Sequence, residues 1–157
     1  MSVNYDFSGK VVLITGSSSG IGASTALLFA KSGASVVITG RNADNVSKIA
    51  KQSTQVSPNK LKALEVVADV TKQEDIRRLL DTTINTFGKL DILVNNAGIG
   101  NRVLITDPNF YETYKRVFST NLDSITYLTH LSVKYLEKTK GNIINNSSVY
   151  SKSMVRN

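Results

Sequence analysis

Two sequence patterns alternate along this chain, and that alternation restricts its fold more than any other feature. Short runs rich in Val, Ile and Leu are separated by longer segments whose apolar residues recur at helical spacing. A near-continuous apolar run is typical of a strand buried on both faces of a parallel sheet. A helix that connects two parallel strands lies across one face of that sheet. The pattern therefore predicts an α/β fold with three layers, α/β/α, around a parallel sheet.

The boundaries of these elements follow from the apolar periods and from the Gly, Pro and Asn residues between them. The predicted strands are residues 11–15, 35–39, 61–67, 90–95 and 142–146. The predicted helices start near Ile21 and stop at Gly33, cover residues 42–52 and 71–87, and end with one long helix from Asp107-Pro108 or Asn109 to about Thr139. No repeat, low-complexity stretch or linker interrupts this order. Residues 1–157 are therefore expected to form a single domain.

Two details of the helices are specific enough to be checked. In the first helix, one side is expected to carry Ile21, Thr25, Leu28 and Phe29. At the start of the long helix, Asn109 and Glu112 have the spacing of a capping box. The apolar face of the long helix, residues 117–136, and the edge of the fifth strand would be exposed unless a further part of the protein covers them.

The composition excludes several functional classes. Cysteine is absent, which excludes disulfides and thiolate catalysis and suits a reducing compartment. The single histidine, His130, cannot build a zinc site alone, so no metal site is expected. No apolar run has the length of a membrane span, and no secretory signal is visible, so a cytoplasmic location is expected. The net charge of +7 arises from scattered basic residues, which argues against a nucleic-acid surface.

A glycine-rich turn joins the first predicted strand to the first helix. Its residues are Gly16, Ser17, Ser18, Ser19, Gly20, Ile21 and Gly22. Glycines let the backbone turn tightly and let a pyrophosphate come close, and the helix N-terminus offers N–H groups to the phosphates. Such glycines also occur in ordinary loops, but the strand before and the helix after favour a Rossmann-type dinucleotide site. The turn lacks the Gly-Lys-Ser/Thr ending that a P-loop needs.

The spacing of this turn, Thr-Gly-x-x-x-Gly-Ile-Gly, resembles the fingerprint of the short-chain dehydrogenase/reductase family. That family includes the hydroxysteroid dehydrogenases and the ketoacyl-carrier-protein reductases. Four further segments resemble family motifs in the same order, namely Asp69-Val70, Asn95-Asn96-Ala97-Gly98, Asn121-Leu122 and Asn145-Asn146-Ser147-Ser148. Taken singly, Asp69 also suits a helix cap, Asn95 and Asn96 also suit a turn, and Asn121 also suits a solvated helix position.

The resemblance implies roles for these segments. Asp69 and Val70 would contact the adenine, and the segment Asn96, Ala97 and Gly98 would lie along the cofactor. Ser148 and Asn121 would supply two of the four catalytic groups: a hydroxyl that holds the substrate oxygen and an asparagine that holds a water. The implied reaction is hydride transfer between a nicotinamide and a carbonyl or alcohol carbon, with a small-molecule substrate and a dimer or tetramer as the assembly.

The end of the second predicted strand bears on the choice of nicotinamide. An acid usually holds the ribose 2′-OH there, but this chain has Gly40, followed by Arg41 and Asn42. A guanidinium can pair with a 2′-phosphate through charge-assisted hydrogen bonds. NADP(H) is therefore favoured over NAD(H), with Arg41 and Asn42 as binding residues. If Arg41 is only a solvated loop residue, the missing acid alone leaves a weak preference.

The catalytic tyrosine and lysine of the family are not found in this sequence. They are spaced Tyr-x-x-x-Lys and follow the serine by about a dozen residues, whereas Tyr150 and Lys152 have the wrong position and spacing. We therefore expect the chain to be the front part of a longer NADP-dependent reductase and to be inactive alone. The alternative is a catalytically inactive NADP(H)-binding or partner-binding form. Gly100, Asn101 and Arg102 are candidates for the nicotinamide end of the site or for plain loop, and the substrate cannot be deduced.

Overall fold

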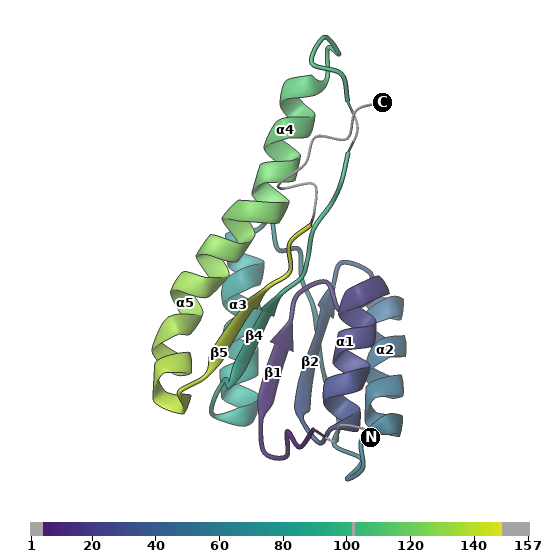
Figure 1. The fold of residues 1–157 in the computed structure, drawn as a ribbon, viewed down its shortest axis with the longest axis vertical. Helices are drawn as coiled ribbons and strands as arrows, with labels where there is room; N and C mark the ends of the chain where they lie inside the picture. The colour runs from purple at the N-terminus through teal and green to yellow at the C-terminus, as the bar shows by residue number, and fades with distance from the viewer. Residues whose placement is uncertain (1–4, 102, 149–157) are drawn as a thin grey trace.

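A computed structural model describes residues 5–101 and 103–148 of the chain, and a five-stranded parallel sheet forms its centre (Figure 1). The strands lie in the order β3-β2-β1-β4-β5, and every neighbouring pair is parallel. Their bounds are Val11–Ile14 for β1, Ser35–Gly40 for β2, Leu64–Val67 for β3, Ile92–Asn95 for β4 and Asn142–Asn145 for β5. The order reverses between β1 and β4. Ligands of open α/β sheets bind at such a reversal, outside the carboxyl ends of the strands.

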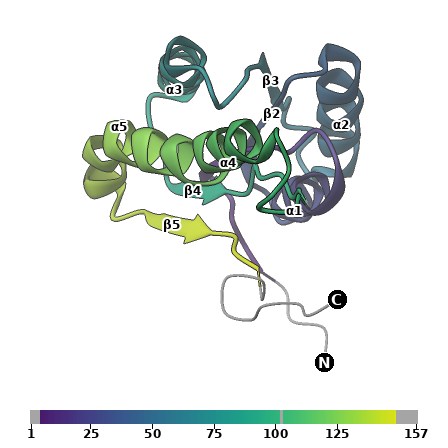
Figure 2. The ribbon, with the colours of Figure 1, turned by 90° about the horizontal axis from the view of Figure 1, so that it is seen from above.

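Helices cover both faces of this sheet (Figure 2). One face carries α1 (Gly20–Lys31) and α2 (Ala43–Val56), and the other carries α3 (Gln73–Phe87) and α5 (Ser124–Thr139). A further helix, α4 (Phe110–Phe118), joins α5 through a π-helical segment, η1 (Ser119–Asp123), and extends past the carboxyl ends of the strands (Figure 1). The predicted three-layer α/β/α class is therefore confirmed.

The residues of β1 show how the two layers of core are divided. Val12 and Ile14 pack with the small residues Ala26 and Ala30 of α1, whereas Leu13 packs with Leu79 of α3 and the residues around it. All four β1 side chains are buried, as expected for a central strand with helices on both faces. The near-continuous apolar runs in the sequence follow from this two-sided burial.

The side of α1 that carries Ile21, Thr25, Leu28 and Phe29 is not the side that is buried against the sheet. Ile21 and Leu28 are 70% and 61% exposed, and the buried residues of α1 are Gly22, Ala23, Ala26 and Ala30. Thr25 and Phe29 are half-buried, and Phe29 packs against the core and contacts Phe7 edge-on. Small residues let α1 approach the sheet closely, so the helix places Gly22 and its alanines inward rather than its larger side chains.

The predicted single long helix was wrong, because η1 interrupts it. π-Turns within α-helices are rare and frequently lie at functional sites. The capping box does not form: the Asn109 side chain makes no cap hydrogen bond, and the Asn109 N–H donates instead to Asp107 Oδ1 at 2.7 Å.

Several other boundaries differ from the sequence prediction, with the largest shifts in the third strand and the second helix. The third strand begins at Leu64 rather than at residue 61, because the preceding N–H groups bond to the end of α2. Leu61 N donates to Ser57 Oγ at 3.2 Å, and Ala63 N donates to Thr54 Oγ1 at 3.1 Å. The second helix runs on to Val56, four residues past its predicted end.

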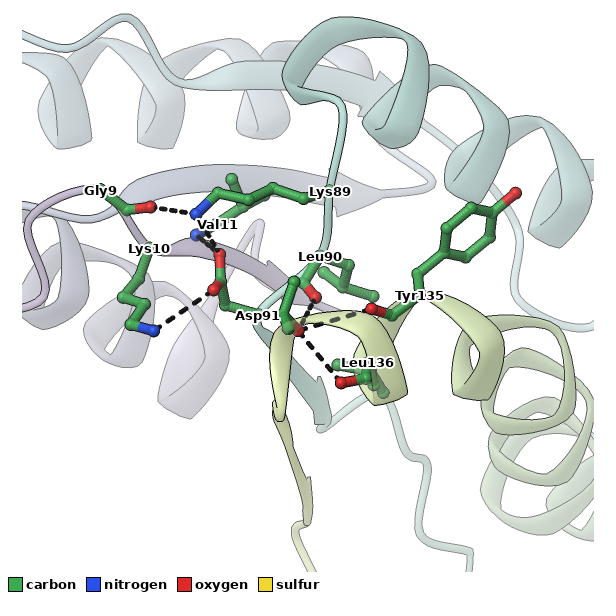
Figure 3. Close-up of polar contacts among 9 residues, drawn as sticks. Gly9, Lys10, Val11, Lys89, Leu90, Asp91, Tyr135 and Leu136 are labelled. Carbon is green, nitrogen blue, oxygen red and sulfur yellow. Dashed lines mark hydrogen bonds and ion pairs between the residues drawn. The ribbon is translucent and has the colours of Figure 1, made fainter.

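A buried carboxylate ties the amino ends of β1 and β4 together (Figure 3). Asp91 accepts a hydrogen bond from Val11 N at 2.9 Å and forms ion pairs with Lys89 at 3.0 Å and Lys10 at 3.4 Å. Burial alone would raise the pKa of Asp91, but the hydrogen bonds from Val11, Lys89 and Lys10 and the charge of Lys89 outweigh it and hold the pKa below its ordinary value.

The outer side of β5 and of the long helical segment is exposed. All four residues of β5 are exposed, including Ile143 and Ile144. Tyr111, Tyr114 and Phe118 stack in sequence along an exposed side of α4. In the described ranges, no helix combines the length and the apolar character needed to cross a membrane.

Candidate functional site

A cleft of about 770 Å³ lies at the carboxyl ends of the strands. Its walls come from the segments that follow all five strands, together with Arg116 and Thr120 of the long helical segment. The predicted site residues that line it are Gly16, Ser18, Ser19, Gly20, Ile21, Arg41, Asp69, Val70, Asn96, Ala97 and Gly98. Five segments far apart in sequence thus meet at the reversal of strand order, which is the position expected of a dinucleotide site.

The glycine-rich turn is shaped by two positive φ angles and one close approach. Gly16 and Gly20 have φ values of +65° and +54°, which L side chains rarely adopt. Gly22 is different, since its φ is ordinary but a Cβ there would overlap the Gly16 carbonyl oxygen and the Asn96 side-chain amide. The turn can therefore fold tightly against the start of α1 only while residue 22 has no side chain.

Ser17 supports the turn from below rather than lining the cleft. Its buried hydroxyl donates to Ile14 O at 2.7 Å and accepts from Thr39 N at 2.9 Å. These bonds join the end of β1 to the end of β2. Ser17 was predicted to bind the cofactor, but its hydroxyl is used by these two bonds and does not line the cleft.

The N-terminus of α1 is open toward the cleft. The N-cap residue Ser19 makes no side-chain cap hydrogen bond. Within the described ranges, the N–H groups of Gly20 and Ile21 donate to no protein acceptor. Free N–H groups and the positive end of the helix dipole form a site for an anion. This cradle fits the pyrophosphate of a dinucleotide.

A hydrogen-bonded group of Thr15, Asn96 and Ala97 holds the turn against the segment after β4. Thr15 Oγ1 accepts from Asn96 N at 2.9 Å and from Ala97 N at 3.0 Å. Asn96 Nδ2 donates to Thr15 O at 3.0 Å and to Gly16 O at 3.4 Å. Asn95 faces the other way and donates to Asn145 Oδ1 at 2.8 Å, which joins β4 to β5. The Asn-Asn pair therefore braces the sheet with one residue and the turn with the next.

Arg41 and Asn42 follow β2 and have different positions. Arg41 lines the cleft, is exposed, and forms no ion pair or hydrogen bond with the described residues. The Asn42 side chain accepts from Asn45 N at 2.8 Å and caps α2, so it does not line the cleft. No acid stands at the end of β2, where Gly40 lines the cleft beside Arg41.

Asp69 is held by its own turn at the edge of the cleft. Its Oδ1 accepts from Thr71 N at 3.0 Å and from Thr71 Oγ1 at 2.8 Å. Its N–H donates to Asp75 Oδ2 at 2.8 Å, and this bond, with the ion pair to Arg78, lowers the pKa of Asp75. The alternative role of Asp69 as a helix cap is excluded, since Lys72 is the N-cap of α3.

Asn121 lies in the π-helical segment and clamps the chain after Gly98. Its Nδ2 donates to Ile99 O and its Oδ1 accepts from Ile99 N, both at 2.9 Å. Asn121 does not line the cleft but fixes the path of Gly98 to Gly100, which do. A side chain that satisfies two backbone groups in this way is a positioning group.

The segment after β5 reaches the same end of the sheet. Asn146 lines the cleft, and Ser148 lies two residues further along, exposed and outside the cleft lining. Tyr150, Lys152 and Arg102 lie outside the described residues. His130 is exposed on α5.

Among the cleft residues that the sequence did not indicate, Arg116 and Thr120 come from the long helical segment. They lie one helical turn apart, and Thr120 Oγ1 donates to Arg116 O at 2.9 Å. The Arg116 guanidinium has no ion-pair partner among the described residues, so the cleft holds two unpaired cations, Arg41 and Arg116. In the sequence, only the helical spacing of Arg116 and Thr120 with Asn121 links them to the site. That spacing does not predict that this helical segment borders the cleft.

Comparison with known proteins agrees with this geometry. Residues 10–157 match the family model described as short chain dehydrogenase. The chain belongs to the short chain dehydrogenase family. Within this family it is 38% identical over 136 residues to a protein of Arabidopsis thaliana named 11-beta-hydroxysteroid dehydrogenase-like 2, which covers 87% of this chain and 44% of that protein.

Solved structures of short chain dehydrogenases share its fold. Glucose dehydrogenase of Caenorhabditis elegans is 43% identical, with a TM-score of 0.80 over 91% of this chain and 56% of the other. A 7α-hydroxysteroid dehydrogenase complexed with NADH and 7-oxo glycochenodeoxycholic acid is 32% identical, with a TM-score of 0.88 over 97% of this chain and 58% of the other. The chain spans less than half the length of the Arabidopsis protein and somewhat more than half the length of these two solved chains.

Proposed function

We propose that the cleft binds NADP(H) and that the protein carrying this chain is an oxidoreductase that interconverts a carbonyl and an alcohol. The observation that carries the proposal is the glycine turn at the open N-terminus of α1, which lies beside the reversal of strand order and lines the same cleft as Arg41. Family membership supports the class of chemistry, and the relatives include dehydrogenases of hydroxysteroids and of glucose.

Each part of the cleft has a task in this proposal. The turn from Gly16 to Gly22 and the first N–H groups of α1 hold the pyrophosphate. Asp69 and Val70 border the adenine, and the segment Asn96 to Gly98 borders the nicotinamide half. When bound, the coenzyme supplies or accepts the hydride.

The reacting oxygen of the substrate is held by the residues after β5. Ser148 donates a hydrogen bond to that oxygen, and Asn121 positions the segment that follows β4. A tyrosine and lysine spaced Tyr-x-x-x-Lys, which the resemblance implies for the complete protein, would hold and move the proton. Turnover is therefore proposed for the complete protein, acting in the cytoplasm as a dimer or tetramer on a small carbonyl or alcohol.

The preference for NADP(H) rests on Arg41 and can be tested directly. A guanidinium without a protein partner is available to the 2′-phosphate, and no acid at the end of β2 repels that phosphate. Arg41→Ala is expected to weaken NADPH binding about tenfold, the loss of one charge-assisted contact, and NADH binding less than twofold. Lys62→Ala, an exposed cation outside the cleft, serves as the matched control.

Titration of each variant with NADPH and with NADH compares the losses of affinity for the two coenzymes. Equal losses for NADPH and NADH in Arg41→Ala would exclude the assignment of Arg41 to the 2′-phosphate. The second candidate function, an inactive form that binds NADP(H) or a partner, predicts the same affinities. It differs in showing no NADPH-dependent carbonyl reduction by the protein isolated from its natural source.

A further inference from the structure

Asn146 ends a line of hydrogen bonds that crosses the cleft floor from β5 to the glycine turn. Its Nδ2 donates to Asn96 Oδ1 at 3.0 Å, and Asn96 Nδ2 in turn donates to Thr15 O at 3.0 Å and Gly16 O at 3.4 Å. The backbone of Asn146 is anchored as well, because its N–H donates to Asn95 O at 2.9 Å. Ser147 and Ser148 follow directly in the chain.

The polarity of this line is fixed by chemistry. Backbone carbonyls only accept hydrogen bonds, so Asn96 must present its NH₂ group to Thr15 and Gly16. The Asn96 oxygen then faces Asn146 and can only accept. Residue 146 must therefore be a donor, and an aspartate of the same shape would place two acceptors against each other.

The Asn96 amide has little freedom to adjust. A Cβ on Gly22 would meet Asn96 Nδ2 at 2.5 Å, so the amide packs closely between the turn and the start of α1. A shift of this amide would move the carbonyls of Thr15 and Gly16, and with them the N–H groups of the turn.

We propose that Asn146 is a positioning residue that sets the glycine turn through Asn96 and so couples the serine-bearing segment to the cofactor cradle. The cofactor part of this inference rests on the proposed function, whereas the coupling itself does not. Binding of the cofactor at the turn and placement of Ser148 thereby depend on one shared amide.

The first experiment measures amide hydrogen exchange without cofactor in three variants. Asn146→Ala is expected to raise exchange in residues 15–22 and 96–98 about threefold, and Asn146→Asp to raise it further, while exchange in β1 and β2 stays unchanged. Asn142→Asp is the matched control, because this exposed residue of β5, the strand that Asn146 follows, makes no described side-chain hydrogen bond. Equal exchange in Asn146→Asp and Asn142→Asp, or a rise spread evenly over the sheet, would overturn the proposal.

The second experiment is a double-mutant cycle on the dissociation constant for NADPH. Asn146→Ala is expected to weaken binding about three- to tenfold alone and less than twofold in an Asn96→Ala background, since it acts through that residue. The same factor in both backgrounds would overturn the proposal. A wild-type protein that binds neither NADPH nor NADH would contradict the proposed function, and the exchange experiment would still decide the role of Asn146.

Discussion

At the scale of single residues, the cleft depends as much on absent side chains as on present ones. The sequence predicted that the glycines of the turn matter, but it did not separate their tasks. Gly16 and Gly20 supply positive φ angles, whereas Gly22 supplies space for the Gly16 carbonyl and the Asn96 amide. That difference depends on Asn96, which lies far away in sequence and reaches the turn only in the folded chain.

The task of Gly22 leads to a prediction. Gly22→Ala is expected to weaken NADPH binding at least tenfold, because the new methyl group must displace the Gly16 carbonyl or the Asn96 amide. Isothermal titration measures the loss. Gly100→Ala is the control, since a Cβ there meets nothing within 4 Å although Gly100 also lines the cleft. Unchanged affinity in Gly22→Ala would show that the turn does not bind the phosphates.

Arg116 shows where residue-level prediction fails. Motif spacing identified Arg41 because it follows a strand end, and strand ends gather at one edge of a parallel sheet. Arg116 belongs to a helix, and a helical pattern does not state how far the helix extends past the sheet. Its place in the cleft follows from the packing of α4 and α5, which the sequence pattern does not contain.

At the scale of elements, the strands and helices were predictable in kind but not in their interruptions. Residues 110–118 and 124–139 each show helical spacing, and no Gly or Pro separates them, so the sequence predicted one helix. The hydrogen bonds of Asn121 to Ile99 lie at the π-turn and depend on the neighbouring loop. The third strand was predicted too long, since the side chains of Ser57 and Thr54 bind the N–H groups that the sheet would otherwise use.

The link between β1 and β4 leads to a prediction about pH. Asp91 has a pKa below its ordinary value when folded, so it stabilises the fold at pH values above the unfolded pKa of about 3.9, and this stability is lost as pH falls through the folded pKa. Asp91→Asn is expected to lower the free energy of unfolding by about 1–2 kcal/mol at pH 7. Urea unfolding measures this loss.

The comparison across pH separates charge from packing. The difference between wild type and Asp91→Asn is expected to shrink as the pH is lowered from 5 toward 2, because the wild-type carboxylate becomes protonated. Asp81→Asn, at an exposed position of α3 without an ion pair in the described ranges, is the control and is expected to change stability by less than about 0.5 kcal/mol. A difference that stays constant with pH would contradict the assignment of this stability to the Asp91 charge.

At the scale of the whole molecule, the alternation of strands and helices was sufficient to predict the fold class and the edge of the sheet that carries the cleft. Neither depends on fine packing: parallel strands need crossovers, and crossovers place every strand end on one side. The pattern does not predict what covers the exposed β5 and α4, because an exposed apolar surface does not identify its partner. The chain also spans only 44% of a curated relative, so the substrate of the complete protein is proposed rather than shown by this chain.

The most direct test of the central claim, that this cleft binds NADP(H), is a thermal unfolding series at increasing NADPH concentration. At a hundred times the dissociation constant, binding to the folded state adds about 2.7 kcal/mol, which corresponds to a rise in Tm of about 5–10 °C for a chain of this size. We expect that rise with NADPH, a smaller one with NADH at equal concentration, and its loss in Gly22→Ala. An unchanged Tm at millimolar NADPH and NADH would exclude binding of NADP(H) in this cleft.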